Sequence, residues 1–113
     1  MAAIIKDIVI DAGDDVNIPF TLLDPSSTRA SVTGYSARMQ VRPSPLSGTK
    51  ALDVTDTDYL PITPGKCTLE LPHAISALVV PGAYVYAIEV SDTSGETYRA
   101  YEGACKVTPE VVR

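Results

Sequence analysis

Few residues of this 113-residue chain could perform chemistry, and they are scattered. The single histidine, His73, follows Pro72, and no serine or cysteine stands near it in the spacing of a nucleophile elbow. Cys67 and Cys105 are the two cysteines, and with one histidine they provide too few ligands for a zinc site. The pattern favours a surface histidine and predicts no catalytic residue, no metal site and no cofactor.

Both cysteines stand at apolar positions of alternating segments. Cys67 belongs to a run with Leu69 and Leu71, and Cys105 precedes Val107 by two residues. A free cysteine behaves as a small hydrophobic residue and is commonly buried. Two buried free thiols are therefore favoured, with a disulfide as the alternative.

Two groups of aspartates stand between alternating segments: Asp11, Asp14 and Asp15, and Asp53, Asp56 and Asp58. Calcium binds several oxygen ligands from such turns, but neither group has the spacing of an EF-hand. Aspartate also stabilises turns by accepting bonds from its own backbone. Turn formation is favoured, and calcium binding is the alternative.

Paired carboxylates for glycoside hydrolysis are defined in space and leave no mark in the spacing. An aromatic platform for sugars is not evident, because tryptophan is absent and Tyr98 and Tyr101 fall on opposite faces of a strictly alternating strand. The chain is expected not to be an enzyme. A small enzyme or inhibitor that uses His73 and the aspartate-rich turns is a further alternative.

The formal net charge of −5 argues against a nucleic-acid partner, because phosphate binding needs clustered lysine and arginine. Arg38 and Arg42, with Lys50 beyond a loop, are the closest basic group, and a solvated strand face is the favoured interpretation. No apolar stretch reaches the roughly 18 residues needed to cross a membrane. The first residues do not resemble a secretion signal, so synthesis in the cytoplasm is expected.

Alternation of apolar and polar residues dominates the chain and predicts half-buried strands. The expected strands cover residues 4–10, 16–22, 32–42, 50–55, 59–62, 67–71, 82–90 and 96–107. Pro19 removes a ladder donor, which predicts a sheet edge or a bulge in its strand. One short helical turn is expected near residues 73–79, because this segment lies between two prolines and is too short for a packed helix.

These elements predict an all-β fold, an immunoglobulin-like antiparallel β-sandwich of seven to eight strands. A small barrel is the alternative architecture. The chain has no internal repeat and no linker long enough to divide it, so residues 1–113 are expected to form a single domain.

Two segments carry a resemblance to a known family: "VTGYSARMQVRPSP" and "VPGAYVYAIEVSDTSGETYRAYEGACKVTPEV". They resemble small virion proteins of tailed bacteriophages, most of all the N-terminal domain of phage baseplate upper proteins and related head or tail accessory proteins. The similarity covers roughly residues 5 to 111. The matching positions are Thr33, Gly34, Tyr35, Arg38, Gln40, Arg42, Gly82, Tyr84, Tyr86, Ile88, Glu89, Gly95, Gly103, Val107 and Pro109. Val32 replaces the usual leucine, and Ala87 replaces the usual aspartate.

The resemblance implies a non-enzymatic structural component of a virion, made in the host cytoplasm, that contacts tail, portal or capsid proteins in a multimeric assembly without binding nucleic acid or membrane. An open sandwich has edge strands that a partner can extend by β-augmentation. The expected contact residues are Ile4, Ile5, Ile8, Ile10, Arg38, Arg42, Val111 and Val112. The alternative is a stand-alone recognition module that binds a glycan or a receptor through its loops.

Overall fold

A computed structural model describes residues 4–21, 36–44, 49–63, 66–91 and 97–109. These residues form nine strand segments and one short helix. In chain order the elements are β1 (Ile4–Ile5), β2 (Ile8–Asp11), β3 (Val16–Thr21), β4 (Ser36–Arg42), β5 (Leu52–Thr55), β6 (Ile62–Thr63), β7 (Lys66–Leu71), α1 (His73–Ser76), β8 (Gly82–Ser91) and β9 (Thr97–Thr108).

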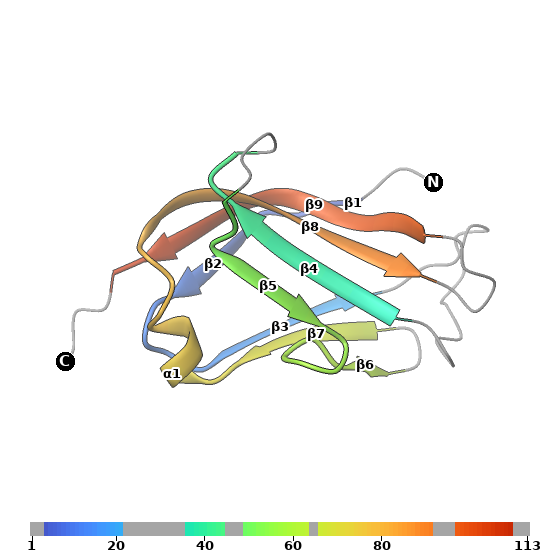
Figure 1. The fold of residues 1–113 in the computed structure, drawn as a ribbon, viewed down its shortest axis with the longest axis horizontal. Coiled ribbons are helices and arrows are strands. Elements are labelled where there is room, and N and C mark those ends of the chain that lie inside the picture. Colours follow the sequence, from blue (N-terminus) through green and yellow to red (C-terminus); the bar gives the residue numbers. More distant parts are fainter. Residues whose placement is uncertain (1–3, 22–35, 45–48, 64–65, 92–96, 110–113) are drawn as a thin grey trace.

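The strands form two stacked sheets, which Figure 1 shows as an upper and a lower layer. The larger sheet has the order β1-β9-β8-β4-β5, with β2 also paired to β9, and the smaller sheet has the order β3-β7-β6. Phe20 and Leu69 of the smaller sheet are fully buried, as are Met39 and Ile88 of the larger one. The chain is an all-β, immunoglobulin-like sandwich, as the sequence predicts.

One pairing departs from the expected antiparallel arrangement. Both β1 and β2 run parallel to β9, with Ile4 opposite Tyr101 and Ile8 opposite Cys105. The offset between partners is the same in both pairs, so β1 and β2 are one edge strand interrupted at Lys6 and Asp7. Counted in this way, the described strands number eight, within the predicted range.

The alternating pattern correctly predicts the buried faces of the central strands. In β4, Ala37, Met39 and Val41 are buried, whereas Ser36 and Arg38 are exposed. Strand β3, which contains Pro19, lies at an edge of the smaller sheet. This position confirms the predicted edge. An edge strand tolerates the hydrogen-bond donor that proline lacks.

Strand β9 contains a bulge that the alternating pattern does not predict. Ile88 pairs with Tyr101, but the next residue, Glu89, pairs with Arg99, so Ala100 is an extra residue. A bulge shifts the alternation of side chains by one position. Tyr98 and Tyr101 consequently both pack against the core, and the prediction that they occupy opposite faces was wrong.

The expected helical turn is present as α1, which joins β7 to β8 after Pro72. Ser76 is fully buried, and its hydroxyl donates to the backbone oxygen of Asp14 at 2.6 Å. The same hydroxyl accepts from the backbone N–H of Gly13 at 3.1 Å. Ser76 thereby joins α1 to the turn between β2 and β3. In the described part of the chain, no helix is long and apolar enough to traverse a membrane.

Candidate functional site

His73 has a structural contact at the surface. Its ring Nδ1 lies 3.1 Å from Oδ1 of Asp15, and its backbone N–H donates to the same oxygen at 2.8 Å. The backbone bond, followed by the bond from the imidazole, lowers the pKa of Asp15. Because His73 is the first residue of α1, this carboxylate serves a backbone N–H at the start of the helix, a common position for aspartate. The described residues include no group of three histidine, cysteine, aspartate or glutamate side chains arranged to hold a metal ion.

Other aspartates of the two predicted groups fasten strands together. Asp11 accepts from the hydroxyl of Thr108 at 2.6 Å, and Asp56 accepts from the backbone N–H of Ala37 at 3.1 Å. Asp53 accepts two bonds from Arg38, at 3.0 and 2.8 Å. These bonds from the guanidinium lower the pKa of Asp53 to about 2. The contacts agree with the favoured interpretation, in which these aspartates stabilise turns and strand ends.

Cys67 and Cys105 are free and buried, as the favoured interpretation predicts. Burial raises the pKa of Cys67 to about 12 and that of Cys105 to about 11. Because the thiolate is the nucleophilic form, both side chains are unreactive in the folded protein.

The predicted contact residues of the N-terminal strand divide into two sets. Ile4 and Ile5 are exposed, with 39% and 69% of their surface accessible. Ile8 and Ile10 are 5% and 0% accessible, so their side chains lie in the core. The prediction was wrong for Ile8 and Ile10, because both fall on the inward face of β2.

The remaining exposed residues of this edge were not among the predicted contact residues. Val9 has 53% of its surface accessible, and Asp7 and Asp11 are exposed beside it. The signal was present in the alternation, since these three residues occupy the face opposite to that of Ile8 and Ile10. We use the name β1–β2 edge for residues 4–11.

A set of contacts around Gly103 holds the β1–β2 edge against β9. The backbone N–H of Lys6 donates to the oxygen of Glu102 at 3.0 Å, and Asp7 Oδ1 accepts from the N–H of Ala104 at 3.0 Å. The hydroxyl of the buried Tyr86 donates to the oxygen of Lys6. A Cβ at Gly103 would collide with that oxygen and lie 2.8 Å from the carbonyl carbon of Lys6. Only glycine permits this close approach.

The side chain of Lys6 turns toward the smaller sheet. Its Nζ donates to the backbone oxygen of Pro19 at 3.1 Å and lies 4.9 Å from the centre of the Phe20 ring. The same ring packs edge-on against Tyr101, with 4.9 Å between centroids. Lys6 thus links the two sheets at this side of the sandwich, and its charge does not cover the β1–β2 edge.

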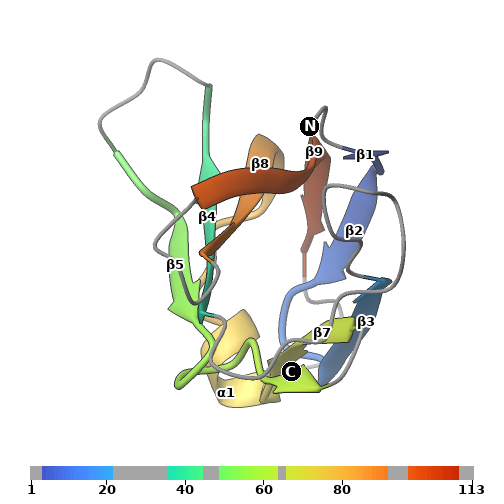
Figure 2. The ribbon, with the colours of Figure 1, turned by 90° about the vertical axis from the view of Figure 1, so that its right-hand side faces the viewer.

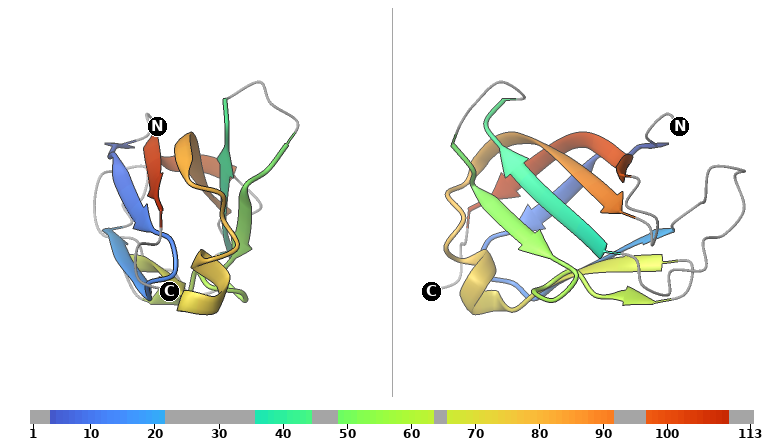
Figure 3. Two further views of the ribbon diagram at one scale, coloured as in Figure 1. Left: turned by 90° about the vertical axis from the view of Figure 1, so that its left-hand side faces the viewer. Right: turned by 45° about the vertical axis from the view of Figure 1, so that its right-hand side comes forward.

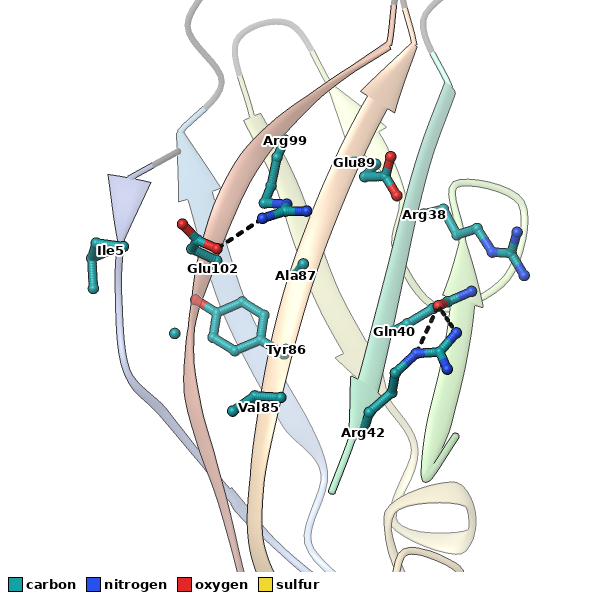
Figure 4. Close-up of a pocket in the computed structure, with 11 residues that line it drawn as sticks. Ile5, Arg38, Gln40, Arg42, Val85, Tyr86, Ala87, Glu89, Arg99 and Glu102 are labelled. Carbon is teal, nitrogen blue, oxygen red and sulfur yellow. Dashed lines mark hydrogen bonds and ion pairs between the residues drawn. The ribbon is translucent and has the colours of Figure 1, made fainter. Parts of the chain in front are cut away.

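A depression of about 410 Å³ lies on the outer face of the larger sheet, next to the β1–β2 edge. Figure 4 shows Ile5 on one side of it and Arg38, Gln40 and Arg42 on the other. Arg42 donates to Gln40 at 2.7 Å. The structure therefore brings together three predicted contact residues, Ile5, Arg38 and Arg42, which the sequence did not predict to be close.

The middle of the depression combines small and charged side chains. Val85 and Ala87 of β8 line it between β9 and β4, and Arg99 pairs with Glu102 at 3.1 Å (Figure 4). With Arg38, Arg42, Arg99, Glu89 and Glu102 present, both signs of charge occur. The other two predicted contact residues, Val111 and Val112, lie outside the described residues.

No protein-family model and no curated protein matches the chain. Among solved structures, the chain is similar to CopC from Methylosinus trichosporium OB3b, with 18% identity, a TM-score of 0.48 and coverage of 96% of this chain and 88% of that one. It is also similar to murine CRIg, with 14% identity, a TM-score of 0.43 and coverage of 92% of both chains. A 2,6-sialyltransferase from Vibrionaceae Photobacterium sp. JT-ISH-224 matches at 18% identity and a TM-score of 0.41, over 96% of this chain and 18% of that one.

Proposed function

We propose that this chain is a non-enzymatic structural component of a bacteriophage virion, a tail, baseplate or head accessory protein that acts through protein–protein contacts in a multimeric assembly. Its contact surface is the β1–β2 edge. The observation that carries the proposal is the exposure of Ile4, Ile5 and Val9 on an edge strand. Exposed apolar edge strands invite pairing with another chain and are usually covered or charged in proteins that act alone.

Two residues of the phage-like motifs support the choice of this edge. Tyr86 and Gly103 match the motif, and both contact the oxygen of Lys6 or leave space for it. The motif therefore includes residues that hold the proposed contact strand in place. Arg38 and Arg42, which also match, line the adjacent depression.

The proposal is tested with virions of a phage that encodes the chain, purified on a density gradient. Mass spectrometry is expected to find the chain in the particles at a constant ratio to the major tail or capsid protein. Electron cryomicroscopy is then expected to locate it at symmetric positions, with the β1–β2 edge against a neighbouring protein. A chain that remains wholly outside the particles overturns the proposal.

The same preparation examines the alternative, a stand-alone recognition module. If the chain is absent from virions and the isolated protein binds defined glycans on an array, the recognition function replaces the structural one. Silence on the array, together with incorporation into particles, excludes it.

A further inference from the structure

Among the described strands, the β1–β2 edge pairs only with β9, which leaves the other side of its backbone without a partner strand among them. The N–H groups of Lys6 and Ala12 donate to Glu102 and Thr108 of β9, at 3.0 and 3.1 Å. Backbone groups of successive residues in a strand point to opposite sides. The N–H and C=O groups of Ile5 in β1 and Val9 in β2 therefore point away from β9, toward the open edge, where an added strand can pair with them.

The side chains at the same positions alternate in chemistry. Ile5, Asp7, Val9 and Asp11 are all exposed on the outer face of the larger sheet, whereas the intervening Ile8, Ile10 and Ala12 are buried. An added strand that pairs with this edge places alternate side chains beside an apolar, an acidic, an apolar and an acidic residue. The edge therefore selects a partner strand by the charge of its side chains as well as by their hydrophobicity.

In both Asp7 and Asp11, one carboxylate oxygen accepts a hydrogen bond from β9. Oδ1 of Asp7 accepts from the N–H of Ala104 at 3.0 Å, and Oδ1 of Asp11 accepts from the hydroxyl of Thr108 at 2.6 Å. Within the described part of the chain, Oδ2 of each residue has no hydrogen-bond partner. Each carboxylate can thus accept a second, charge-assisted bond without first losing its present one.

We propose that the β1–β2 edge binds an extended segment of a partner polypeptide as an additional strand, whose outward side chains alternate between apolar and basic residues. The inference rests on the proposed structural role and identifies the partner surface for it. The basic residues pair with Asp7 and Asp11, and the apolar ones cover Ile5 and Val9. A partner of this charge also suits a protein whose formal net charge is −5.

A second copy of this chain fits the edge less well. A two-fold, antiparallel pairing that matches Ile5 with Val9 places the two copies of Asp7 directly opposite each other. Like charges in directly opposite positions destabilise a strand pair. A concentration-dependent dimer of the purified protein, abolished by substitution at Val9, would overturn the basic partner in favour of self-pairing.

The direct test uses the full-length protein and a short fluorescein-labelled peptide in which threonine alternates with valine and lysine in turn. Fluorescence anisotropy is expected to show binding that weakens as salt is added, because exposed ion pairs are screened. The matched control peptide has glutamate in place of lysine and is expected to bind at least about tenfold more weakly. Equal binding of the two peptides, or no binding of the lysine peptide, overturns the proposal.

Two variants separate the charge from the strand pairing. The double variant Asp7→Asn with Asp11→Asn keeps oxygen acceptors for Ala104 and Thr108 and is expected to weaken peptide binding about tenfold, since it removes two exposed ion pairs. Val9→Pro removes an N–H that faces the open edge and leaves the bonds to β9, so it is expected to abolish binding. The double variant Asp14→Asn with Asp58→Asn removes two exposed negative charges elsewhere and is expected to bind as the parent protein does.

Circular dichroism and thermal melting confirm that each variant is folded before it is scored. Incorporation into virions then distinguishes the two proposals. If the parent protein enters particles but Val9→Pro and the double asparagine variant enter equally well, the edge inference fails and the structural role stands. If the peptide binds as expected but the chain is absent from particles, the structural role fails and the partner chemistry stands.

Discussion

The two edges of the larger sheet differ in how they meet solvent. The β1–β2 edge lies at one side of the molecule and β5 at the opposite side, as Figures 2 and 3 show. At the β5 edge, Asp53 accepts from Arg38 at 2.8 Å and from Lys50 at 3.3 Å, so charged side chains cover the surface. At the β1–β2 edge, Ile4, Ile5 and Val9 are exposed apolar residues.

The difference lies in where the charged side chains are directed. Lys6 extends to Pro19 and Phe20 of the smaller sheet, and Asp7 is held at Ala104 of β9. The charge of Lys6 does not shield the apolar residues, and although Asp7 and Asp11 are exposed beside them, Ile5 and Val9 remain 69% and 53% accessible. Charge that covers an edge strand is a common protection against unwanted pairing. The β1–β2 edge is therefore the proposed contact surface, whereas ion pairs cover the β5 edge.

The largest expected effect concerns the attachment of the β1–β2 edge. Gly103→Ala places a Cβ 2.8 Å from the carbonyl carbon of Lys6, and backbone atoms must move to admit it. We expect a loss of about 3 kcal/mol in the free energy of unfolding, the upper range for an overpacked core site. Urea denaturation measures the loss, and hydrogen exchange is expected to accelerate at residues 5–12 before other strands.

The matched control is Ala104→Ser at the next position, which is exposed. This variant is expected to unfold within about 0.5 kcal/mol of the parent, as surface substitutions usually do. If Gly103→Ala is equally harmless, the close approach of Lys6 does not hold the edge strand.

A smaller effect is expected from the bond between Tyr86 and the edge strand. Tyr86→Phe removes the hydroxyl that donates to the oxygen of Lys6 and keeps the buried ring. We expect a loss of about 1 kcal/mol, the usual net value of a hydrogen bond. Tyr84→Phe is the comparison, because the Tyr84 hydroxyl donates to Val80 in an exposed place. Equal losses in the two variants would show that the bond to Lys6 has no special weight.

The charged β5 edge is expected to respond to pH and salt, with a still smaller effect. The pKa of Asp53 is lowered from 3.8 to about 2, so its stabilisation is fully present above pH 4 and is lost as pH falls toward 2. Asp53→Asn is expected to cost about 0.5 kcal/mol at neutral pH, because solvent screens the exposed pair. Chemical denaturation from pH 2 to 7 measures the difference. A gap between Asp53→Asn and the parent that is as large at pH 2 as at pH 7 would contradict the assignment.

Much of the fold could be predicted because it follows from local alternation. The buried positions of β4 and β8, the edge position of Pro19 and the single helical turn each depend on a few neighbouring residues. The same rule separates Ile8 and Ile10 from the exposed positions of their strand, and applying it strictly would have predicted which isoleucines lie in the core.

The remaining features depend on contacts between distant parts of the chain. The parallel pairing of β2 with β9 joins Ile8 to Cys105, and alternation alone does not give the direction of a partner strand. The bulge at Ala100 reverses the face of Tyr98 without a distinctive residue to mark it. The requirement for glycine at Gly103 arises from Lys6, which no spacing in the sequence links to it. The candidate site, the β1–β2 edge, depends on two of these non-local features, the pairing with β9 and the approach of Lys6 to Gly103.

The two buried cysteines allow local opening of the β1–β2 edge to be compared with local opening of the smaller sheet in the parent protein. Cys105 lies opposite Ile8 of β2, whereas Cys67 lies opposite Phe20 of β3. Both thiols must be uncovered before they react, since burial raises the pKa of each.

If the β1–β2 edge opens locally, Cys105 should react with an aromatic disulfide reagent about twofold faster than Cys67 in dilute urea. The single-thiol variants Cys67→Ala and Cys105→Ala allow each rate to be measured alone. Equal rates that follow the global unfolding curve would mean that the edge strand opens only with the whole sandwich, and that a partner strand adds to a rigid edge.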